Sequence, residues 1–154
     1  MSFDPEYYYR LSTMFRGADM CLDIFNGGDY NNIPHLTECA DFSGQYWCIK
    51  PSDRDGYYRL FTMFRGADMC LDIFNGGDRN NMPHLTECAG FSGQYWSIKP
   101  SERDGYYRLS TMFRGADMCL DIINGGDRNN MPELKECGDF SGQYWQFTKT
   151  DKKV

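Results

Sequence analysis

The sequence has few of the features that mark a membrane protein or a nucleic-acid-binding protein. Its 154 residues contain no long apolar run and have a mean hydropathy of −0.64, so we predict no membrane insertion. Basic residues number 16 against 22 acidic ones and are scattered along the chain. The net charge of −6 repels phosphate, which makes nucleic acid an unsuitable partner.

Two further features are missing. None of the seven cysteines lies in the close C-x-x-C spacing that places two thiolates on one zinc ion, so the sequence predicts no metal site of that kind. Residues 1–6 are acidic and polar and lack the apolar segment of a secretory signal peptide. The first residues therefore predict no export signal.

The chain does contain a repeat with a period of 49 residues. The segment Tyr-Tyr-Arg-Leu starts at Tyr8, Tyr57 and Tyr106, and the same spacing holds for cysteines and tryptophans. One such unit buries too little apolar surface to fold alone, whereas three units can share one core. We predict a single domain over residues 1–154, with repeats at approximately 7–55, 56–104 and 105–154, hereafter copies 1, 2 and 3.

The pattern within each copy predicts four short strands. In copy 1 these occupy residues 11–15, 21–25, 34–39 and 46–49, separated by turn sequences such as Asn-Gly-Gly-Asp at 26–29. No apolar stripe of helical period occurs. A propeller needs about four blades or more, and an open solenoid needs distinct end repeats. Twelve short strands in a closed threefold unit predict an all-β fold, the β-trefoil.

Six of the seven cysteines pair by position, 18 residues apart in every copy. This recurrence predicts one disulfide within each copy: Cys21–Cys39, Cys70–Cys88 and Cys119–Cys137. Each would contribute roughly 3 kcal/mol and would indicate an extracellular or secreted protein. The alternative is buried reduced thiols in a cytosolic protein.

Cys48 has no cysteine counterpart. The equivalent positions hold the polar residues Ser97 and Gln146, so we expect Cys48 to be exposed. It would then be a free thiol or a link between chains. At the chain end, three lysines, Lys149, Lys152 and Lys153, predict a loose polar tail.

Each copy also combines a Cys-Leu-Asp-Ile strand, a second cysteine and a Gln-x-Trp element. In copy 1 these are residues 21–24, Cys39 and residues 45–47. With this combination three times in register, the chain resembles the ricin B-chain-type lectin family over essentially its whole length. The resemblance implies a β-trefoil whose tryptophans fill the shared core, a glutamine that braces the local turn, and a carbohydrate-binding function.

In that family the aspartate of the Cys-Leu-Asp element accepts hydrogen bonds from sugar hydroxyls. A carboxylate is suited to this because it has only acceptors and can take two neighbouring hydroxyl donors. The alternative is that each aspartate only braces the nearby Asn-Gly-Gly turn. The resemblance therefore assigns candidate sugar-binding roles to the aspartates and to the glutamines of Gln-x-Trp: Asp23, Asp72, Asp121, Gln45, Gln94 and Gln143.

The chain departs from the pattern of the galactose-binding members. Where their sugar stacks on an aromatic residue, this chain has Thr37, Thr86 and Lys135. The asparagine that usually precedes Gln-x-Trp is glycine in every copy. The galactose specificity of ricin is therefore not transferred to this chain.

Other side chains can replace the missing aromatic residue on which the sugar would stack. The loop before each Ser-Gly-Gln contains Phe42, Phe91 or Phe140, which we predict as the stacking residue, with anchoring of the loop as the alternative. His35 and His84 can donate to a hydroxyl or to an acetamido carbonyl. The predicted partners are thus glycans that contain N-acetylhexosamine or galactose-type sugars.

Copy 3 differs most at the predicted pocket. Ile123 replaces the phenylalanine at the end of the second strand, Glu133 replaces the histidine, and Lys135 replaces the threonine. We therefore expect up to three sites of unequal strength. Several sites on one body would raise avidity and agglutinate cells, and a homo-oligomer would add more.

Three other functions are alternatives to sugar binding. An enzyme is not predicted, because no Ser–His–acid order repeats and the acids at Asp41 and Asp139 correspond to Gly90. Calcium is the sharper rival, because the loop at 26–32 is rich in oxygen ligands, but it lacks the length and the bidentate Glu of an EF-hand. No cofactor is predicted. A β-trefoil used as a protein-interaction or inhibitor scaffold, without sugar binding, is the remaining alternative.

Overall fold

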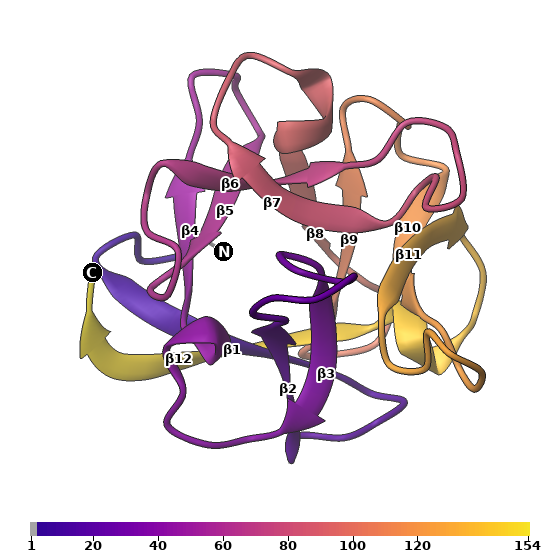
Figure 1. The fold of residues 1–154 in the computed structure, drawn as a ribbon, viewed down its shortest axis with the longest axis horizontal. Coiled ribbons are helices and arrows are strands. Elements are labelled where there is room, and N and C mark those ends of the chain that lie inside the picture. Colours follow the sequence, from indigo (N-terminus) through magenta and orange to yellow (C-terminus); the bar gives the residue numbers. More distant parts are fainter. Residues whose placement is uncertain (1–2) are drawn as a thin grey trace.

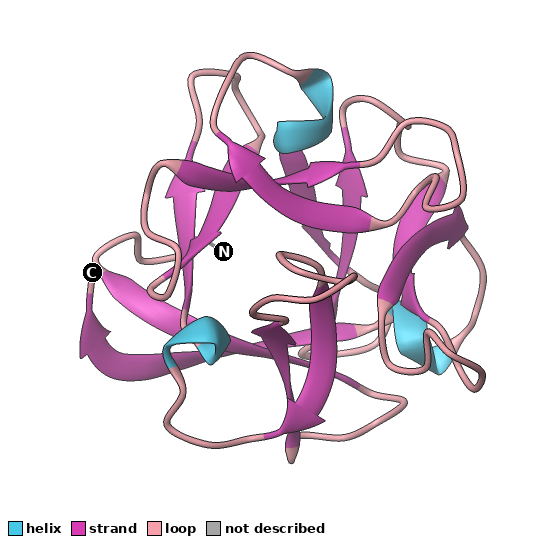
Figure 2. Ribbon diagram, in the orientation of Figure 1, coloured by secondary structure: helices cyan, strands magenta, loops and turns pink. Residues whose placement is uncertain are grey.

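In the computed structural model, which describes residues 3–154, each copy forms four strands and one short 3-10 turn (Figures 1 and 2). Copy 1 contains β1 (Tyr7–Thr13), β2 (Met20–Ile24), β3 (Pro34–Glu38), η1 (Ser43–Gln45) and β4 (Trp47–Pro51). Copy 2 contains β5 (Tyr58–Thr62), β6 (Met69–Ile73), β7 (Pro83–Glu87), η2 (Ser92–Gln94) and β8 (Trp96–Pro100). Copy 3 contains β9 (Tyr107–Thr111), β10 (Met118–Ile122), β11 (Pro132–Glu136), η3 (Ser141–Gln143) and β12 (Trp145–Lys153).

Six strands close into a barrel, and the other six form three hairpins. The barrel order is β1-β12-β9-β8-β5-β4, so that every copy contributes its first and last strand. The hairpins β2-β3, β6-β7 and β10-β11 surround the centre of Figure 1. This arrangement is the β-trefoil that the repeat predicted, and the all-β fold with twelve strands is confirmed.

A ring of backbone hydrogen bonds joins the three hairpins. The asparagine that precedes each hairpin's second strand by two residues has a positive φ, 71–73°, which asparagine tolerates better than most residues. In this conformation its carbonyl accepts a hydrogen bond from a leucine of the next copy at 2.8–2.9 Å. The three pairs are Asn32 with Leu85, Asn81 with Leu134 and Asn130 with Leu36. Each copy is therefore bonded to both of its neighbours.

The three tryptophans lie in the shared core, as the sequence predicted. Trp47, Trp96 and Trp145 are completely buried. Each indole N–H donates to a leucine carbonyl of its own copy at 2.9 Å, which satisfies the one polar group that burial would otherwise leave unpaired.

Phe3 closes the barrel on the pseudo-threefold axis. Its ring contacts one tyrosine from each copy, Tyr9, Tyr58 and Tyr107, with ring centroids 5.3–5.7 Å apart. It also contacts Phe147 at 5.0 Å. Phe3 is only 6% exposed, although it lies outside the repeat. One side chain thus completes a packing arrangement that all three copies share.

The three predicted disulfides are confirmed. Cys21–Cys39, Cys70–Cys88 and Cys119–Cys137 are bonded, each with Cα atoms 5.0 Å apart. Each joins the second strand of a copy to the residue just after the third strand.

The expectation that Cys48 is exposed is wrong. Its side chain is 1% exposed and packs with Tyr8, Tyr46 and Phe61. The reason lies across the ladder: Cys48 pairs with Phe61, whereas Ser97 pairs with a serine. The apolar partner covers the thiol, and burial raises the pKa of Cys48 to about 11.

The expectation of a loose tail is also wrong. Strand β12 continues to Lys153 and pairs with β1, so that Lys149 lies opposite Tyr9 and Lys153 opposite Tyr7. The Lys149 ammonium also lies 3.1 Å from the carboxylate of Asp4.

Among residues 3–154, no helix is long and apolar enough to cross a membrane.

Replacing Phe3 by alanine tests the role of this residue in closing the barrel. We expect Phe3→Ala to lower the free energy of unfolding by about 3–5 kcal/mol, because it leaves a cavity between three tyrosines. Phe42→Ala is the matched control, since Phe42 is 60% exposed and its loss should cost less than about 1 kcal/mol. Equal unfolding midpoints of the two variants in urea would contradict this role.

The buried thiol predicts slow chemistry. With a pKa of about 11, Cys48 is roughly one part in a thousand thiolate at pH 8. Ellman's reagent should therefore react very slowly with the native protein and should titrate one thiol per chain in denaturant without reductant. Rapid reaction of the native protein would mean that Cys48 is accessible. More than one thiol in denaturant would mean that disulfides are missing.

Candidate functional site

Two equivalent cavities of about 240 and 250 Å³ lie beside the aspartates of the Cys-Leu-Asp elements in copies 2 and 3. Residues 49 positions apart line both. In copy 2 they are Asp72, Ile73, Asn75, Phe91, Ser92 and Gly93, and in copy 3 Asp121, Ile122, Asn124, Phe140, Ser141 and Gly142. The matching residues of copy 1 begin at Asp23 and end at Gly44.

Each cavity is completed by the following copy. Phe113 of copy 3 lines the cavity of copy 2, and Phe15 of copy 1 lines that of copy 3. Phe64 is the matching residue for copy 1. The sequence reasoning placed Phe15 in a strand and missed this role. One sequence feature could have indicated it: a Phe-Arg-Gly triplet begins two residues after the end of the first strand in every copy.

The aspartate is held from behind by the glutamine of Gln-x-Trp. In copy 2, Asp72 Oδ2 accepts a hydrogen bond from Gln94 Nε2 at 3.1 Å, and Oδ1 accepts one from the backbone N–H of Ile73 at 2.7 Å. The same two bonds hold Asp23 and Asp121. Each carboxylate oxygen keeps a second lone pair, so the group can still accept from a ligand.

The three glutamines, predicted among the sugar-binding residues, lie behind the aspartates. The side chains of Gln45, Gln94 and Gln143 are completely buried. Each amide N–H₂ also donates to the carbonyl of the glutamate just before the second cysteine, at 3.0–3.1 Å. The role left to these glutamines is to position the carboxylates rather than to contact a ligand.

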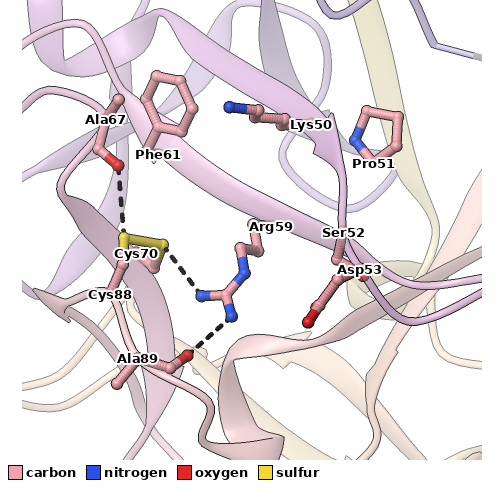
Figure 3. A pocket seen from close by; sticks show the side chains of 10 residues that line it. All are labelled: Lys50, Pro51, Ser52, Asp53, Arg59, Phe61, Ala67, Cys70, Cys88 and Ala89. Atoms are coloured by element: carbon pink, nitrogen blue, oxygen red, sulfur yellow. Dashed lines mark hydrogen bonds between the residues drawn. A yellow bond between two sulfur atoms is a disulfide. The ribbon is translucent and has the colours of Figure 1, made fainter.

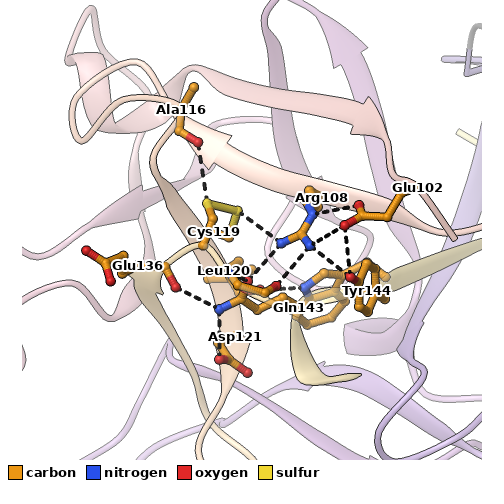
Figure 4. Close-up of a disulfide and its surroundings, with 12 residues drawn as sticks. Glu102, Arg108, Ala116, Cys119, Leu120, Asp121, Glu136, Gln143 and Tyr144 are labelled. Atoms are coloured by element: carbon orange, nitrogen blue, oxygen red, sulfur yellow. Dashed lines mark hydrogen bonds and ion pairs between the residues drawn. A yellow bond between two sulfur atoms is a disulfide. The ribbon is translucent and has the colours of Figure 1, made fainter. Parts of the chain in front are cut away.

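An arginine extends this network to the barrel in copies 2 and 3. Arg108 Nη1 donates to Gln143 Oε1 at 2.9 Å, and its Nη2 donates to the Gly138 carbonyl and the Tyr144 hydroxyl, both at 2.9 Å (Figure 4). Arg59 makes the same three contacts in copy 2. The conserved spacing of Tyr-Tyr-Arg-Leu and Gln-x-Trp therefore produces a chain of hydrogen bonds that ends at the aspartate.

Glycine before Gln-x-Trp has a steric cause. A Cβ atom at Gly93 would lie 2.4 Å from Asp72 Oδ1, and at Gly44 or Gly142 the distance to the matching oxygen would be 2.3 Å. The backbone of the 3-10 turn thus lies directly against the carboxylate. This contact replaces the asparagine side chain that the resemblance led us to look for.

The loop phenylalanines are exposed beside the carboxylates. Phe42, Phe91 and Phe140 are 60–63% exposed, and each precedes a 3-10 turn in an extended conformation. The facing phenylalanines of the next copy are 36–37% exposed. Behind Phe113, the guanidinium of Arg114 stacks on the ring at 4.3 Å and fixes its orientation. Two aromatic rings therefore border each cavity.

The histidines do not line the cavities. His35 stacks on Phe25, and His84 stacks on Phe74, both with ring centroids 3.7 Å apart. Burial lowers the pKa of both histidines, against a smaller opposing effect of the nearby aspartate, so the neutral imidazole is favoured. Each histidine is thus part of its hairpin, opposite the aspartate in the ladder, and packs against a phenylalanine.

The substitutions that distinguish copy 3 also lie outside the lining. Ile123, Glu133 and Lys135 are not among the residues that border its cavity, and Glu133 is instead 3.7 Å from Lys135. The cavities of copies 2 and 3 have matching residues and similar volumes. The linings of these two cavities are therefore equivalent, although the sequence led us to expect that copy 3 would differ most at the pocket.

The asparagine-rich loop, considered as a calcium site, holds an arginine. Arg65 of copy 2 donates from Nε to Asn32 Oδ1 at 2.7 Å, and from Nη2 to Asn26 and Asn31 at 3.2 and 2.8 Å. Arg16 makes the same contacts with copy 3. Within residues 3–154, no group of three or more His, Cys, Asp or Glu side chains is arranged to hold a metal ion. The loop's oxygens serve to join the copies.

The contact between glycine and aspartate predicts an effect of one methyl group. Gly93→Ala should lower the free energy of unfolding by about 1–3 kcal/mol, because the new Cβ would overlap Asp72 Oδ1. Gly90→Ala is the control: no atom lies within 4 Å of its Cβ position, so its effect should stay within about 0.5 kcal/mol. If urea unfolding gives the same midpoint for both variants, the carboxylate does not lie against Gly93.

Solved structures with this fold resemble the chain at low sequence identity. A designed threefold-symmetric protein, ThreeFoil, has a TM-score of 0.75 and 22% identity, over 93% of this chain and 99% of its own. SeviL, solved with asialo-GM1 saccharide, has a TM-score of 0.66 and 18% identity, over 94% of this chain and 98% of its own. A mosquitocidal holotoxin has a TM-score of 0.80 and 17% identity, but this chain spans only 18% of its length.

Curated protein sequences gave no match to the chain. The family model of the ricin-type beta-trefoil lectin domain matches residues 59–154, which is more than half of the chain. The matched part contains two of the three Gln-x-Trp elements and two of the three disulfides. The chain belongs to the ricin-type β-trefoil lectin domain family.

Proposed function

We propose that this protein is a carbohydrate-binding lectin with one sugar site at each boundary between copies. The observation that carries the proposal is a partly buried carboxylate, held by a buried glutamine, that faces a cavity bordered by two exposed phenylalanines. This combination occurs in the same place in copies 2 and 3, and copy 1 has the same residues.

The lining suits both faces of a sugar. Asp72 accepts from hydroxyl groups, while Asn75, whose Oδ1 already accepts from Arg114 at 3.2 Å, retains amide N–H groups to donate. Phe91 and Phe113 offer apolar surface for the C–H face of the ring. Donors, acceptors and an apolar wall around a cavity of about 240 Å³ suit one monosaccharide.

N-acetylhexosamine and galactose-type sugars remain the ligands that we propose. Because the histidines stack on phenylalanines and do not line the cavities, they no longer support this choice of sugar. The support comes from the second phenylalanine of each cavity, which can contact an acetamido methyl group. SeviL, which shares the fold, was solved with the saccharide of asialo-GM1.

The three proposed sites belong to one molecule and would bind a glycan-bearing surface together. Each monosaccharide contact is weak, and multivalency raises the avidity of a chain for a glycan-bearing surface. This arrangement supports agglutination without catalysis. Three disulfides support an extracellular or secreted location, since such bonds persist in oxidising compartments. A homo-oligomer would multiply the sites further.

The proposal predicts that exposed phenylalanines carry affinity but not stability. The triple variant Phe42→Ala, Phe91→Ala, Phe140→Ala should bind about tenfold more weakly or worse at each site, a loss of ~1.4 kcal/mol, because the sugar loses its wall. A glycan array followed by titration calorimetry with the best sugar measures this. The control is the triple variant Glu38→Gln, Glu87→Gln, Glu136→Gln, since these exposed glutamates end the second strand of each hairpin and do not line the cavities.

Unchanged affinity of the phenylalanine variant would contradict the site assignment. A folded wild-type protein that binds no glycan on a broad array would contradict the lectin function itself and would favour an interaction scaffold. Single variants add a further check, because Phe91→Ala and Phe140→Ala should each remove one site of equal strength.

A further inference from the structure

A second kind of cavity lies where the last strand of copy 1 meets the first strand of copy 2, beside the disulfide of copy 2. It measures about 350 Å³ and opens between β4, β5 and the Cys70–Cys88 bond (Figure 3). Lys50, Arg59 and Asp53 are its charged lining residues, and Phe61 forms apolar wall. None of these residues borders the sugar site at Asp72.

Two like charges face each other at this cavity. Lys50 lies directly opposite Arg59 in the β4–β5 ladder, an arrangement that is unfavourable unless an anion lies near. Arg54 adds a third cation, since its guanidinium lies over the same Tyr95 ring as that of Arg59. Asp53 is the one acid among the lining residues. Positive charge is thus concentrated here in a protein whose net charge is −6.

The boundary between copies 2 and 3 shows how a carboxylate fits beside the matching arginine. The same cross-strand pair, Lys99 and Arg108, borders a smaller cavity of about 170 Å³. There Glu102 places Oε1 3.4 Å from Arg108 Nε and Oε2 3.2 Å from Nη2 (Figure 4). Both oxygens thus contact one guanidinium, which is the geometry by which arginine recognises carboxylates.

The cavity at Arg59 lacks this internal carboxylate for two reasons. Asp53 stands in place of Glu102 and is one methylene shorter, and its Oδ1 accepts instead from the Tyr95 hydroxyl at 3.0 Å. In copy 3 the hydroxyl of the equivalent Tyr144 lies 2.6 Å from Asp139 and 3.2 Å from Glu102, whereas copy 2 has Gly90 in place of Asp139. Within residues 3–154, no hydrogen-bond acceptor therefore contacts the Nε–H of Arg59.

We propose that the cavity at Arg59 binds the carboxylate of an acidic sugar, such as a hexuronic acid, in the place that Glu102 occupies beside Arg108. The carboxylate accepts from Arg59 Nε, Lys50 neutralises its second oxygen, and the sugar ring lies against Phe61. The protein then carries one acidic-sugar site besides its neutral-sugar sites, and the two kinds of site share no lining residue.

The test is an NMR titration of the ¹⁵N-labelled protein with sodium glucuronate at constant ionic strength. Saturable shifts are expected at the amides of Ser52, Arg59 and Ala89. Glucose and sodium chloride should leave these signals in place, because glucose has no carboxylate and chloride has no pair of oxygens to bind the cations. Asp53→Glu should weaken glucuronate about tenfold or more, since the longer side chain occupies Arg59 as Glu102 occupies Arg108.

Two further variants sharpen the result. Lys50→Gln should weaken glucuronate binding, whereas the matched change Lys99→Gln, beside Arg108, should not. Phe91→Ala removes the neighbouring neutral-sugar site and should leave glucuronate binding unchanged, so failure of the proposed lectin function is distinguishable from failure of this proposal. Equal binding of glucuronate by wild type and Asp53→Glu, equal shifts with glucose or chloride, or no saturable shift at all would overturn it.

Discussion

The hydrogen bond from the buried glutamine of Gln-x-Trp to the aspartate of Cys-Leu-Asp links the core of this protein to its surface. Gln94 is completely buried, two residues before the core tryptophan Trp96, and its amide donates a hydrogen bond of 3.1 Å to Asp72. A carboxylate that emerges from a largely apolar strand needs such a partner, because an unpaired buried acceptor is costly. Since the partner satisfies only part of its capacity, the carboxylate remains available at the surface.

Contacts between copies make the sites a property of the closed ring. Each cavity needs a phenylalanine from the following copy, and an arginine beside that phenylalanine binds the asparagines of the preceding hairpin. The third site therefore exists only because copy 1 returns beside copy 3. Phe3, which contacts one tyrosine from each copy, packs at the point where the three meet.

The repeat made the fold predictable, because strands, cysteines and tryptophans recur at one spacing. The wall of the site was predicted in part: Phe91 follows from its loop, but Phe113 comes from another copy and only the closed barrel brings it near. The burial of Cys48 depends on its cross-strand partner Phe61, which a comparison of copies at one position does not reveal. The positions of the histidines could not be predicted without knowing that each stacks on the phenylalanine just after the adjacent strand.

Differences between the copies are confined to a few positions and change local charge. The loss of one carboxylate at Gly90 and the shortening of another at Asp53 leave Arg59 without the internal partner that Arg108 has. Small substitutions on a repeated framework can thus open a site in one copy and close it in another. The proposed sugar sites differ in this respect, because the residues that line their cavities are the same in copies 2 and 3.

The most direct test of the sites at the copy boundaries is a crystal structure of the protein soaked with N-acetylgalactosamine. We predict a sugar ring between the two phenylalanines of each boundary, with hydroxyl groups bonded to Asp23, Asp72 and Asp121. Sugar bound away from these aspartates, or open cavities at saturating sugar, would contradict the assignment.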